Sequence, residues 1–291
     1  MGRRFTIISL CVAALLGLSV GRSLAGEPRE VHPAGNVKYH ATRGAGKPGR
    51  PGRTPNLTYH GGPVMKSAAV TAIYWGTSWS SSSFVGDKIS GLGTFYSGVG
   101  GTAYAGTNTE YTDGSGPVGS AVSYDGNVLD TTAAPSGAPS TSSILAEVSK
   151  VITNPVSNGY YPVYIDKKRG SAGYCAWHSY GTVKGVVVQF AFFFNLDGDA
   201  GCDPQDTWTS HSQGLAALAN VTGHELSEAL TDPHLNAWYD QQGAENSDKC
   251  AWTFNTSSVN LSGTPWKVQG NWSNAAYNNS SGYALRGCID R

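Results

Sequence analysis

Apolar residues along the chain follow two periods, one typical of strands and one typical of helices. Continuous apolar runs, which predict buried strands, cover residues 69–75, 161–165 and 185–194. The run at 185–194 is apolar on both faces, as expected for a central strand of a covered sheet. Apolar residues at helical spacing cover residues 84–96, 144–152 and 212–230. Because the strands and helices interleave, we predict an α/β (or α+β) domain with a mixed sheet.

The N-terminus has the pattern of a secretory signal peptide. A basic start with Arg3 and Arg4 precedes an apolar run over residues 5–20, and Ser23-Leu24-Ala25 matches a small-x-small cleavage site. The run is too short for a membrane span, and we find no second long apolar stretch. We therefore predict that residues 1–25 are removed and that the mature protein is secreted and extracellular, with no membrane span.

Residues 26–55 are rich in Gly, Pro and Arg and show no periodicity. This composition predicts a disordered basic linker or a propeptide. Adhesion to an anionic cell wall is the functional alternative. We expect order to begin near Asn56 and to extend over one domain, residues 56–291.

Composition and charge narrow the class of protein. Hydrophobic residues make up 40% and charged residues 14% of the 291 residues, which argues against a disordered chain. Without residues 1–25 the chain has 17 basic and 20 acidic residues, a net charge of −3. Residues 26–55 carry +4 and the remainder −7. An acidic domain behind a short basic tail does not favour nucleic-acid binding.

Four of the five cysteines lie outside the predicted signal peptide: Cys175, Cys202, Cys250 and Cys288. Four cysteines in an exported chain predict two disulfides, and three pairings exist. We favour the pairing that is local in sequence, Cys175–Cys202 and Cys250–Cys288.

The sequence GHELSE at residues 223–228 lies within the predicted helix 212–230. His224 and Glu228 are four residues apart and project from one helix face, which we expect to line a cleft. The opposite face should carry the apolar stripe that packs on the core, formed by Leu215, Leu218, Thr222, Leu226, Ala229 and Leu230. The spacing is that of the HExxH metallopeptidases, with Glu in place of the second His. It predicts His224 and Glu228 as metal ligands and Glu225 as the general base acting on a metal-activated water.

A third metal ligand is needed, and four residues after the helix are candidates. Asp232 is eight residues beyond His224, but Pro233 disfavours helical geometry there, so Asp232 is also a candidate for closing the helix end. His234 has the metzincin spacing without the glycine that turns the chain. We favour Glu245, with Asp248 close behind.

Two further clusters carry candidate chemistry. His178 follows Cys175 closely and is predicted to act in the cleft, as a ligand or as a group that stabilises an oxyanion. Asp197, Asp199 and Asp203 follow EF-hand-like offsets and are a candidate calcium site, although Ala200 stands where that loop needs Gly.

The metal itself is predicted to be one divalent ion, with zinc favoured. One His and two carboxylates place a charge of −2 on the ion, which shifts selectivity from zinc toward manganese or calcium.

Short motifs in the domain resemble the phosphate-induced protein 1 (EXORDIUM-like) family. The resemblance rests on residues 56–64 (NLTYHGGPV), 73–76 (IYWG), 175–178 (CAWH), 223–229 (GHELSEA) and 238–250, in this order. Plant members are described as secreted apoplastic proteins linked to growth responses. Microbial relatives with the same HExxE segment look like metallopeptidases, which implies His224 and Glu228 as ligands and Glu225 as base.

The favoured function is therefore a secreted, metal-dependent, peptidase-like hydrolase with a zincin-like domain, acting on an extracellular peptide or protein. One alternative is a non-catalytic extracellular module with a structural metal that contacts cell-wall glycan. Another is a signalling or structural protein without a metal.

Overall fold

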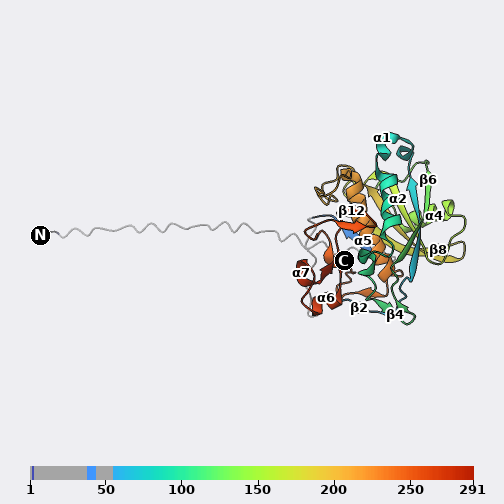
Figure 1. The fold of residues 1–291 in the computed structure, drawn as a ribbon. Coiled ribbons are helices and arrows are strands. Elements are labelled where there is room, and N and C mark those ends of the chain that lie inside the picture. Colours follow the sequence, from blue (N-terminus) through green and yellow to red (C-terminus); the bar gives the residue numbers. More distant parts are fainter. Residues whose placement is uncertain (1, 3–37, 44–54) are drawn as a thin grey trace.

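The computed structural model describes residue 2, residues 38–43 and residues 55–291. A six-stranded mixed sheet forms the centre of this part of the chain (Figure 1). The predicted signal peptide lies outside the described residues, apart from residue 2. The prediction of a mixed α/β architecture with a mixed sheet is confirmed.

The strands of the sheet are arranged in the order β1-β8-β9-β7-β3-β6. Their bounds are β1 Lys38–Ala41, β3 Ser67–Trp75, β6 Ala121–Asp130, β7 Gly159–Lys168, β8 Tyr174–Val183 and β9 Val186–Asn195. Strands β6, β3, β7 and β9 run parallel to one another. At one end of the sheet β8 pairs antiparallel with β9, and β1 pairs antiparallel with β8. The run at 185–194 forms β9, which pairs on both sides as predicted.

Helices cover both faces of the sheet (Figure 1). Helix α2 (Lys88–Val99) and helix α5 (Gln213–Thr231) pack against each other on one face, and α4 (Thr141–Val151) packs on the other. The predicted helix 84–96 is two helices, α1 (Ser82–Val85) and α2, because Gly86 takes a positive φ of 52° between them.

Short elements complete the fold. Four two-stranded ribbons pair β2 (Thr58–Tyr59) with β10 (Trp238–Tyr239), β4 (Thr112–Asp113) with β5 (Gly116–Pro117), β11 (Val259–Leu261) with β12 (Thr264–Trp266), and β13 (Asn271–Trp272) with β14 (Cys288–Ile289). The short helices are α3 (Ala103–Gly106), α6 (Asn274–Asn278), α7 (Ala284–Gly287) and the 3-10 turns η1 (Thr77–Ser80) and η2 (Asp248–Cys250).

Residues 26–37 and 44–54 of the predicted linker lie outside the described residues, so the structure bears on that prediction only at residues 38–43 and 55. Residues 38–41 form strand β1 rather than part of a disordered linker, and they pair antiparallel with β8. Backbone pairing along an exposed strand edge depends little on composition, so a Gly/Pro-rich neighbourhood does not prevent it. Ordered structure therefore occurs before Asn56.

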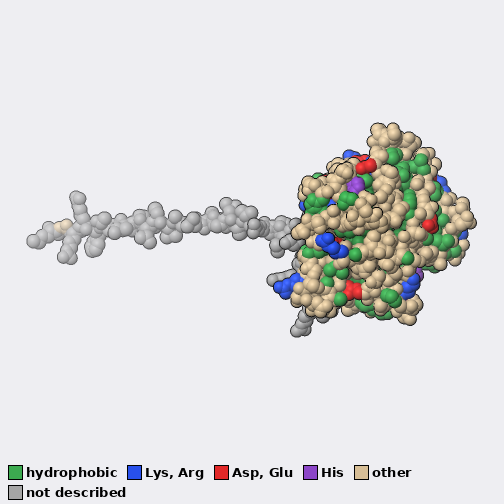
Figure 2. Space-filling model, viewed as in Figure 1, with side chains coloured by type: hydrophobic (Ala, Val, Ile, Leu, Met, Phe, Trp, Pro, Cys, Tyr) green, Lys and Arg blue, Asp and Glu red, His purple; other side chains and the backbone are tan. Residues whose placement is uncertain are grey.

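Both predicted disulfides are present, Cys175–Cys202 and Cys250–Cys288. On the face shown in Figure 2, acidic and basic side chains are scattered among uncharged polar surface, in keeping with the low charged fraction. Within the described residues, no helix is both long enough and apolar enough to span a membrane.

Candidate metal centre

Helix α5 supplies two side chains of the centre, His224 and Glu228. Ser212 caps its first turn, because the Ser212 side chain accepts a hydrogen bond from the Leu215 amide at 3.2 Å. Gly223 lets the helix approach α3, since a Cβ there would lie 2.8 Å from the Tyr104 hydroxyl. His224 and Glu228 lie on one face of the helix, with His224 Nε2 3.0 Å from Glu228 Oε1.

The helix is buried on all sides, which corrects the expected two-faced pattern. Every residue from Gly214 to Thr231 is buried. The polar face contacts later parts of the chain rather than lining an open cleft, since the Asp248 amide donates to Glu228 and Gln269 Nε2 lies 2.9 Å from His224 Nδ1. The small and apolar residues that surround the polar triplet allow packing on both sides of the helix, so periodicity alone could not identify an exposed face.

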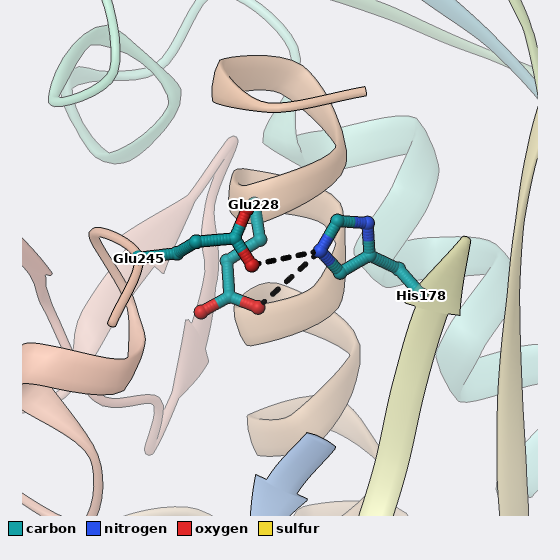
Figure 3. Close-up of side chains that lie close together, drawn as sticks. All are labelled: His178, Glu228 and Glu245. Carbon is teal, nitrogen blue, oxygen red and sulfur yellow. Dashed lines mark hydrogen bonds and ion pairs between the residues drawn. The ribbon is translucent and has the colours of Figure 1, made fainter. Parts of the chain in front are cut away.

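Strand β8 brings His178 to the same place. Side chains alternate along a strand, and His178 points toward α5 whereas Gly181, on the other side of β8, faces Leu145 of α4. Figure 3 shows His178 facing two carboxylates, one from α5 and one from a loop. Its Nε2 lies 3.1 Å from Glu245 Oε2 and 3.6 Å from Glu228 Oε2.

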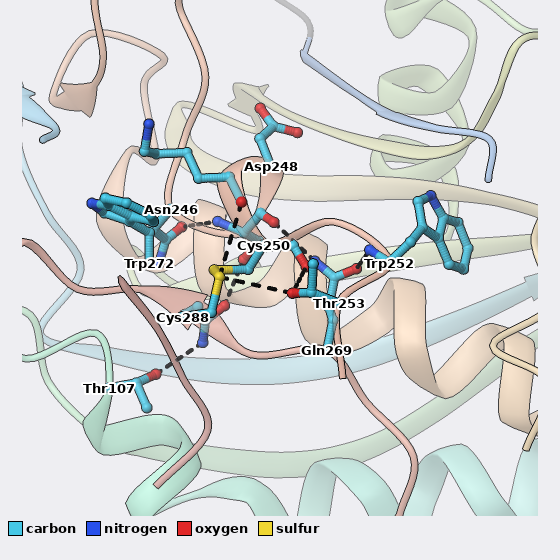
Figure 4. The surroundings of a disulfide bond; sticks show 12 residues. Thr107, Asn246, Asp248, Cys250, Trp252, Thr253, Gln269, Trp272 and Cys288 are labelled. Carbon is cyan, nitrogen blue, oxygen red and sulfur yellow. Dashed lines mark hydrogen bonds between the residues drawn. A yellow bond between two sulfur atoms is a disulfide. The ribbon is translucent and has the colours of Figure 1, made fainter. Parts of the chain in front are cut away.

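The segment before and through η2 supplies Glu245 and Asp248. The amide of Asp248 donates to Glu228 Oε1 at 3.0 Å, and the amide of Glu245 donates to Asp248 Oδ2 at 3.1 Å. Cys250, two residues after Asp248 in the same 3-10 turn, forms a disulfide with Cys288 of β14 (Figure 4). The disulfide therefore ties this segment to the C-terminal end of the chain.

Five side chains form two overlapping groups that could hold a metal. We call these five side chains the metal centre: His178, His224, Glu228, Glu245 and Asp248. One group contains His178, Glu228 and Glu245, and the other contains His224, Glu228 and Asp248. Within each group the potential ligand atoms lie within 4.8 Å of one another. Asp248 is the most exposed of the five, and its side chain is only 14% exposed.

Glu225, next to His224 in α5, has no evident structural role. It is fully buried, and neither carboxylate oxygen has a hydrogen-bond partner among the described residues. Burial raises the pKa of Glu225 well above its ordinary value, the charge of His224 opposes this, and the charges of Glu228, Asp248 and Glu245 add to it. A buried carboxyl without partners is costly, so its place beside the centre calls for a chemical role.

His40 is a residue of the site that sequence reasoning missed. It is fully buried in β1, and its Nδ1 lies 2.7 Å from His224 Nδ1. Burial, and then the charge of His224, lowers the pKa of His40 well below its ordinary value, so its ring is neutral and able to accept a hydrogen bond. In the sequence, His40 is a single histidine within a segment that otherwise resembles a linker, so nothing there predicted a role in the site.

The partners of His224 Nδ1 bear on whether its Nε2 can bind a metal. Gln269 Nε2 lies 2.9 Å away and also donates to the Ser247 carbonyl at 2.9 Å. Its amide group has two N–H donors, so it can donate to His224 Nδ1 as well, but only when Nδ1 carries no proton. Metal binding through Nε2 requires a proton on Nδ1. His40 Nδ1 is then the acceptor for that proton, because an amide nitrogen only donates.

Tyr160 of β7 is a second residue that sequence reasoning missed. Its hydroxyl is buried and has no hydrogen-bond partner among the described residues. Burial, then Tyr164, then Glu225 and Glu228 raise its pKa well above the ordinary value. The phenol is therefore a neutral hydrogen-bond donor whose pKa is raised in part by the charge of Glu225.

The other candidates for the third ligand have structural roles. Asp232 ends α5, and its Oδ1 accepts hydrogen bonds from the amides of Asn236 and Ala237, both at 2.6 Å. His234 stacks on Tyr180, with ring centroids 4.6 Å apart. Of the four candidates, the structure brings Glu245 and Asp248 into the centre.

The three acids considered for calcium have separate partners. Asp197 pairs with Lys88, and Asp199 accepts two hydrogen bonds from Arg169, one of them from Nη2 at 2.9 Å. Asp203 accepts a hydrogen bond from the Gln205 amide at 2.7 Å. Within the described part of the chain these carboxylates are not among the groups that could jointly hold an ion.

No protein-family model matches the sequence, and comparisons with curated proteins and with solved structures find no match either. The function of the centre must therefore be argued from its own geometry.

Proposed function

We propose that this protein is a secreted, metal-dependent hydrolase of the peptidase type, built on a zincin-like arrangement of the HExxE helix. The observation that carries the proposal is that two overlapping groups of His and carboxylate side chains share Glu228 on the helix that also carries the buried, unpartnered Glu225. Imidazole and carboxylate donors suit zinc, and the number of carboxylates makes the site acceptable to manganese as well.

A divalent ion held here would lower the pKa of a coordinated water toward neutrality. Glu225 would take the proton from that water and pass it to the leaving amine of a peptide. Its oxygens are free of other hydrogen bonds within the described residues, so the carboxylate needs to break no contact to do so. The buried Tyr160 hydroxyl also lacks a partner there and is the second candidate donor that we propose for the site.

The remaining parts of the proposal rest on sequence. The signal-peptide pattern at residues 1–25 supports export, and the two disulfides are compatible with an extracellular location. Membership of the phosphate-induced protein 1 family stays a prediction that rests on short motifs. An extracellular peptide or protein is the proposed substrate.

The test is Glu225→Gln in the purified mature protein, assayed on an unstructured protein substrate with the metal content measured in parallel. We expect hydrolysis to fall by about 10²–10⁴-fold, the range of general-base catalysis, with the metal content unchanged. Glu110→Gln, the same substitution at an acid outside the centre, should leave both unchanged. Equal hydrolysis by Glu225→Gln and the parent would contradict the proposal.

Burial favours a second candidate, a non-catalytic extracellular module with a structural metal. Four of the five side chains of the centre are at most 1% exposed, so the described residues leave little room for substrate. Such a protein would show no hydrolysis by the parent and a melting temperature that falls on chelation.

A further inference from the structure

Glu228 belongs to both halves of the metal centre. Its Oε1 faces His224 Nε2 at 3.0 Å, and its Oε2 faces His178 Nε2 at 3.6 Å (Figure 3 shows the second group). The remaining carboxylates divide in the same way, because Glu245 Oε2 lies 3.1 Å from His178 Nε2 and Asp248 Oδ1 lies 3.4 Å from His224 Nε2. Each oxygen of Glu228 therefore has its own histidine, and each histidine has its own second carboxylate.

The separations within each half fit ligands of one ion. Two ligands at bond lengths of 2.0–2.2 Å, as for zinc, lie roughly 3.0–3.5 Å apart at angles between 90° and 109°. The four histidine–carboxylate separations, from 3.0 to 3.6 Å, fall close to this range in both halves. In each half the histidine and both carboxylates therefore lie at distances that suit a shared ion, with all potential ligand atoms within 4.8 Å of one another.

We propose that the centre holds two divalent transition-metal ions bridged by Glu228. One ion would bind His178, Glu245 and Glu228 Oε2, and the other would bind His224, Asp248 and Glu228 Oε1. A carboxylate with one oxygen on each ion suits the separation of roughly 3.5–4 Å that two-metal hydrolases use. This inference rests on the proposed metal-dependent function and extends it from one ion to two.

Charge supports two ions rather than one. Three ligand carboxylates carry −3, so one divalent ion would leave the buried centre at −1. The nearby Lys249 does not compensate, because its Nζ pairs with Asp240 at 2.7 Å. A second divalent ion compensates the negative charge that one ion leaves on the three ligand carboxylates, and a low-dielectric interior disfavours such an uncompensated charge.

The unpartnered Glu225 is a second and independent sign of a ligand. Its two buried oxygens have no hydrogen-bond partner within the described residues, yet its carboxyl lies in the field of both halves of the centre. A water held between two ions would give it a partner. The same water would be more acidic than one held by a single ion.

The experiment measures metal stoichiometry in the full mature chain. The protein is stripped with a chelator, reloaded with Zn²⁺ alone, desalted and analysed for zinc. We expect two equivalents for the parent. His178→Ala and Asp248→Asn should each retain one equivalent, because each removes a ligand from a different half, and Glu228→Ala should retain none tightly. Asp125→Asn, at an exposed acid of β6, should retain two.

A spectroscopic measurement on the parent protein keeps the test valid even where a variant fails to fold. After loading with Mn²⁺, electron paramagnetic resonance should show the exchange-coupled spectrum of a dinuclear pair. The six-line spectrum of isolated Mn²⁺, at one equivalent, would overturn the two-ion proposal and leave the proposed function standing. No bound metal would overturn both. Two bound ions without any hydrolysis would support the pair and overturn the hydrolase.

Discussion

At the scale of single residues, a buried acid outside the metal centre, Glu147, makes the stability of the fold depend on pH. Glu147 of α4 is 3% exposed, and Lys150 Nζ donates to its Oε2 at 3.2 Å. Burial and a hydrogen bond shared with Asp130 raise the pKa of Glu147 to about 7, while Lys150 acts in the opposite direction. Asp130 keeps a pKa well below its usual range, because hydrogen bonds from Glu147 and Lys150 outweigh its burial.

The raised pKa of Glu147 makes stability depend on pH. Its pKa in the folded state exceeds the ordinary value of 4.5, so folding favours the protonated form. The stability that it contributes is complete below about pH 4.5 and is lost as the pH rises through about 7. Glu147→Gln keeps a donor for Asp130 and should raise the free energy of unfolding by about 1–2 kcal/mol at pH 8, with no gain at pH 4.

Denaturant melts of both proteins at pH 4, 6 and 8 check this prediction. Glu110→Gln serves as the control at an acid outside the cluster of Glu147, Asp130 and Lys150. An equal change in stability at all three pH values would contradict the linkage between Glu147 and pH.

At the scale of elements, strand β1 covers the centre from the open edge of the sheet. Its His40 lies against His224, with ring centroids 3.9 Å apart, and contacts the Trp252 ring at 4.8 Å. The Trp252 indole donates to the Ala41 carbonyl at 2.9 Å, which holds the strand in place. Removal of one buried ring should therefore open a path to the His224 side of the centre.

The prediction is that His40→Ala speeds up the loss of metal to a chelator. We expect at least a tenfold faster rate, because the substitution removes both the covering ring and the acceptor for His224 Nδ1–H; loss of such an outer contact typically costs 10–100-fold in metal affinity. Tyr39→Phe is the matched control, since Tyr39 is the neighbouring residue of the same strand and points to the other face. Identical rates for parent and His40→Ala would exclude β1 as a cover.

At the scale of the whole molecule, the centre connects segments that are distant in sequence. Its ligands come from a strand, a helix and a disulfide-bonded turn, so unfolding of the domain would disperse them. Metal at 1,000 times its dissociation constant should add about 4 kcal/mol to the stability of the native state. For a chain of this size the melting temperature should rise by roughly 10 °C.

Calorimetry of the stripped and the zinc-loaded protein measures that rise. Glu225→Gln should keep it, because Glu225 is not a ligand, whereas Glu228→Ala should lose most of it. A melting temperature unaffected by zinc would show that the centre binds no metal in the folded state.

Much of the fold follows from local pattern, because periodicity reports which residues must be buried. The apolar runs that became β3, β7 and β9 and the spacings that became α4 and α5 were predicted from sequence, as were both disulfides. Strands β8 and β6 were not predicted. Buried polar residues interrupt β8, and every second residue of β6 is exposed, so neither forms an apolar run.

The sequence by itself determined that His224, Glu225 and Glu228 share one helix, because a spacing of four residues fixes one face of any α-helix. It also identified Glu245 and Asp248 as acids close enough to return to that helix. Only the tertiary structure decided that His178 and His40 meet them, because the pairing of β1, β8 and β9 sets which side chains face α5. The division into two halves that share Glu228 depends on distances of 3.0–3.6 Å between side-chain atoms, and no local pattern encodes such distances.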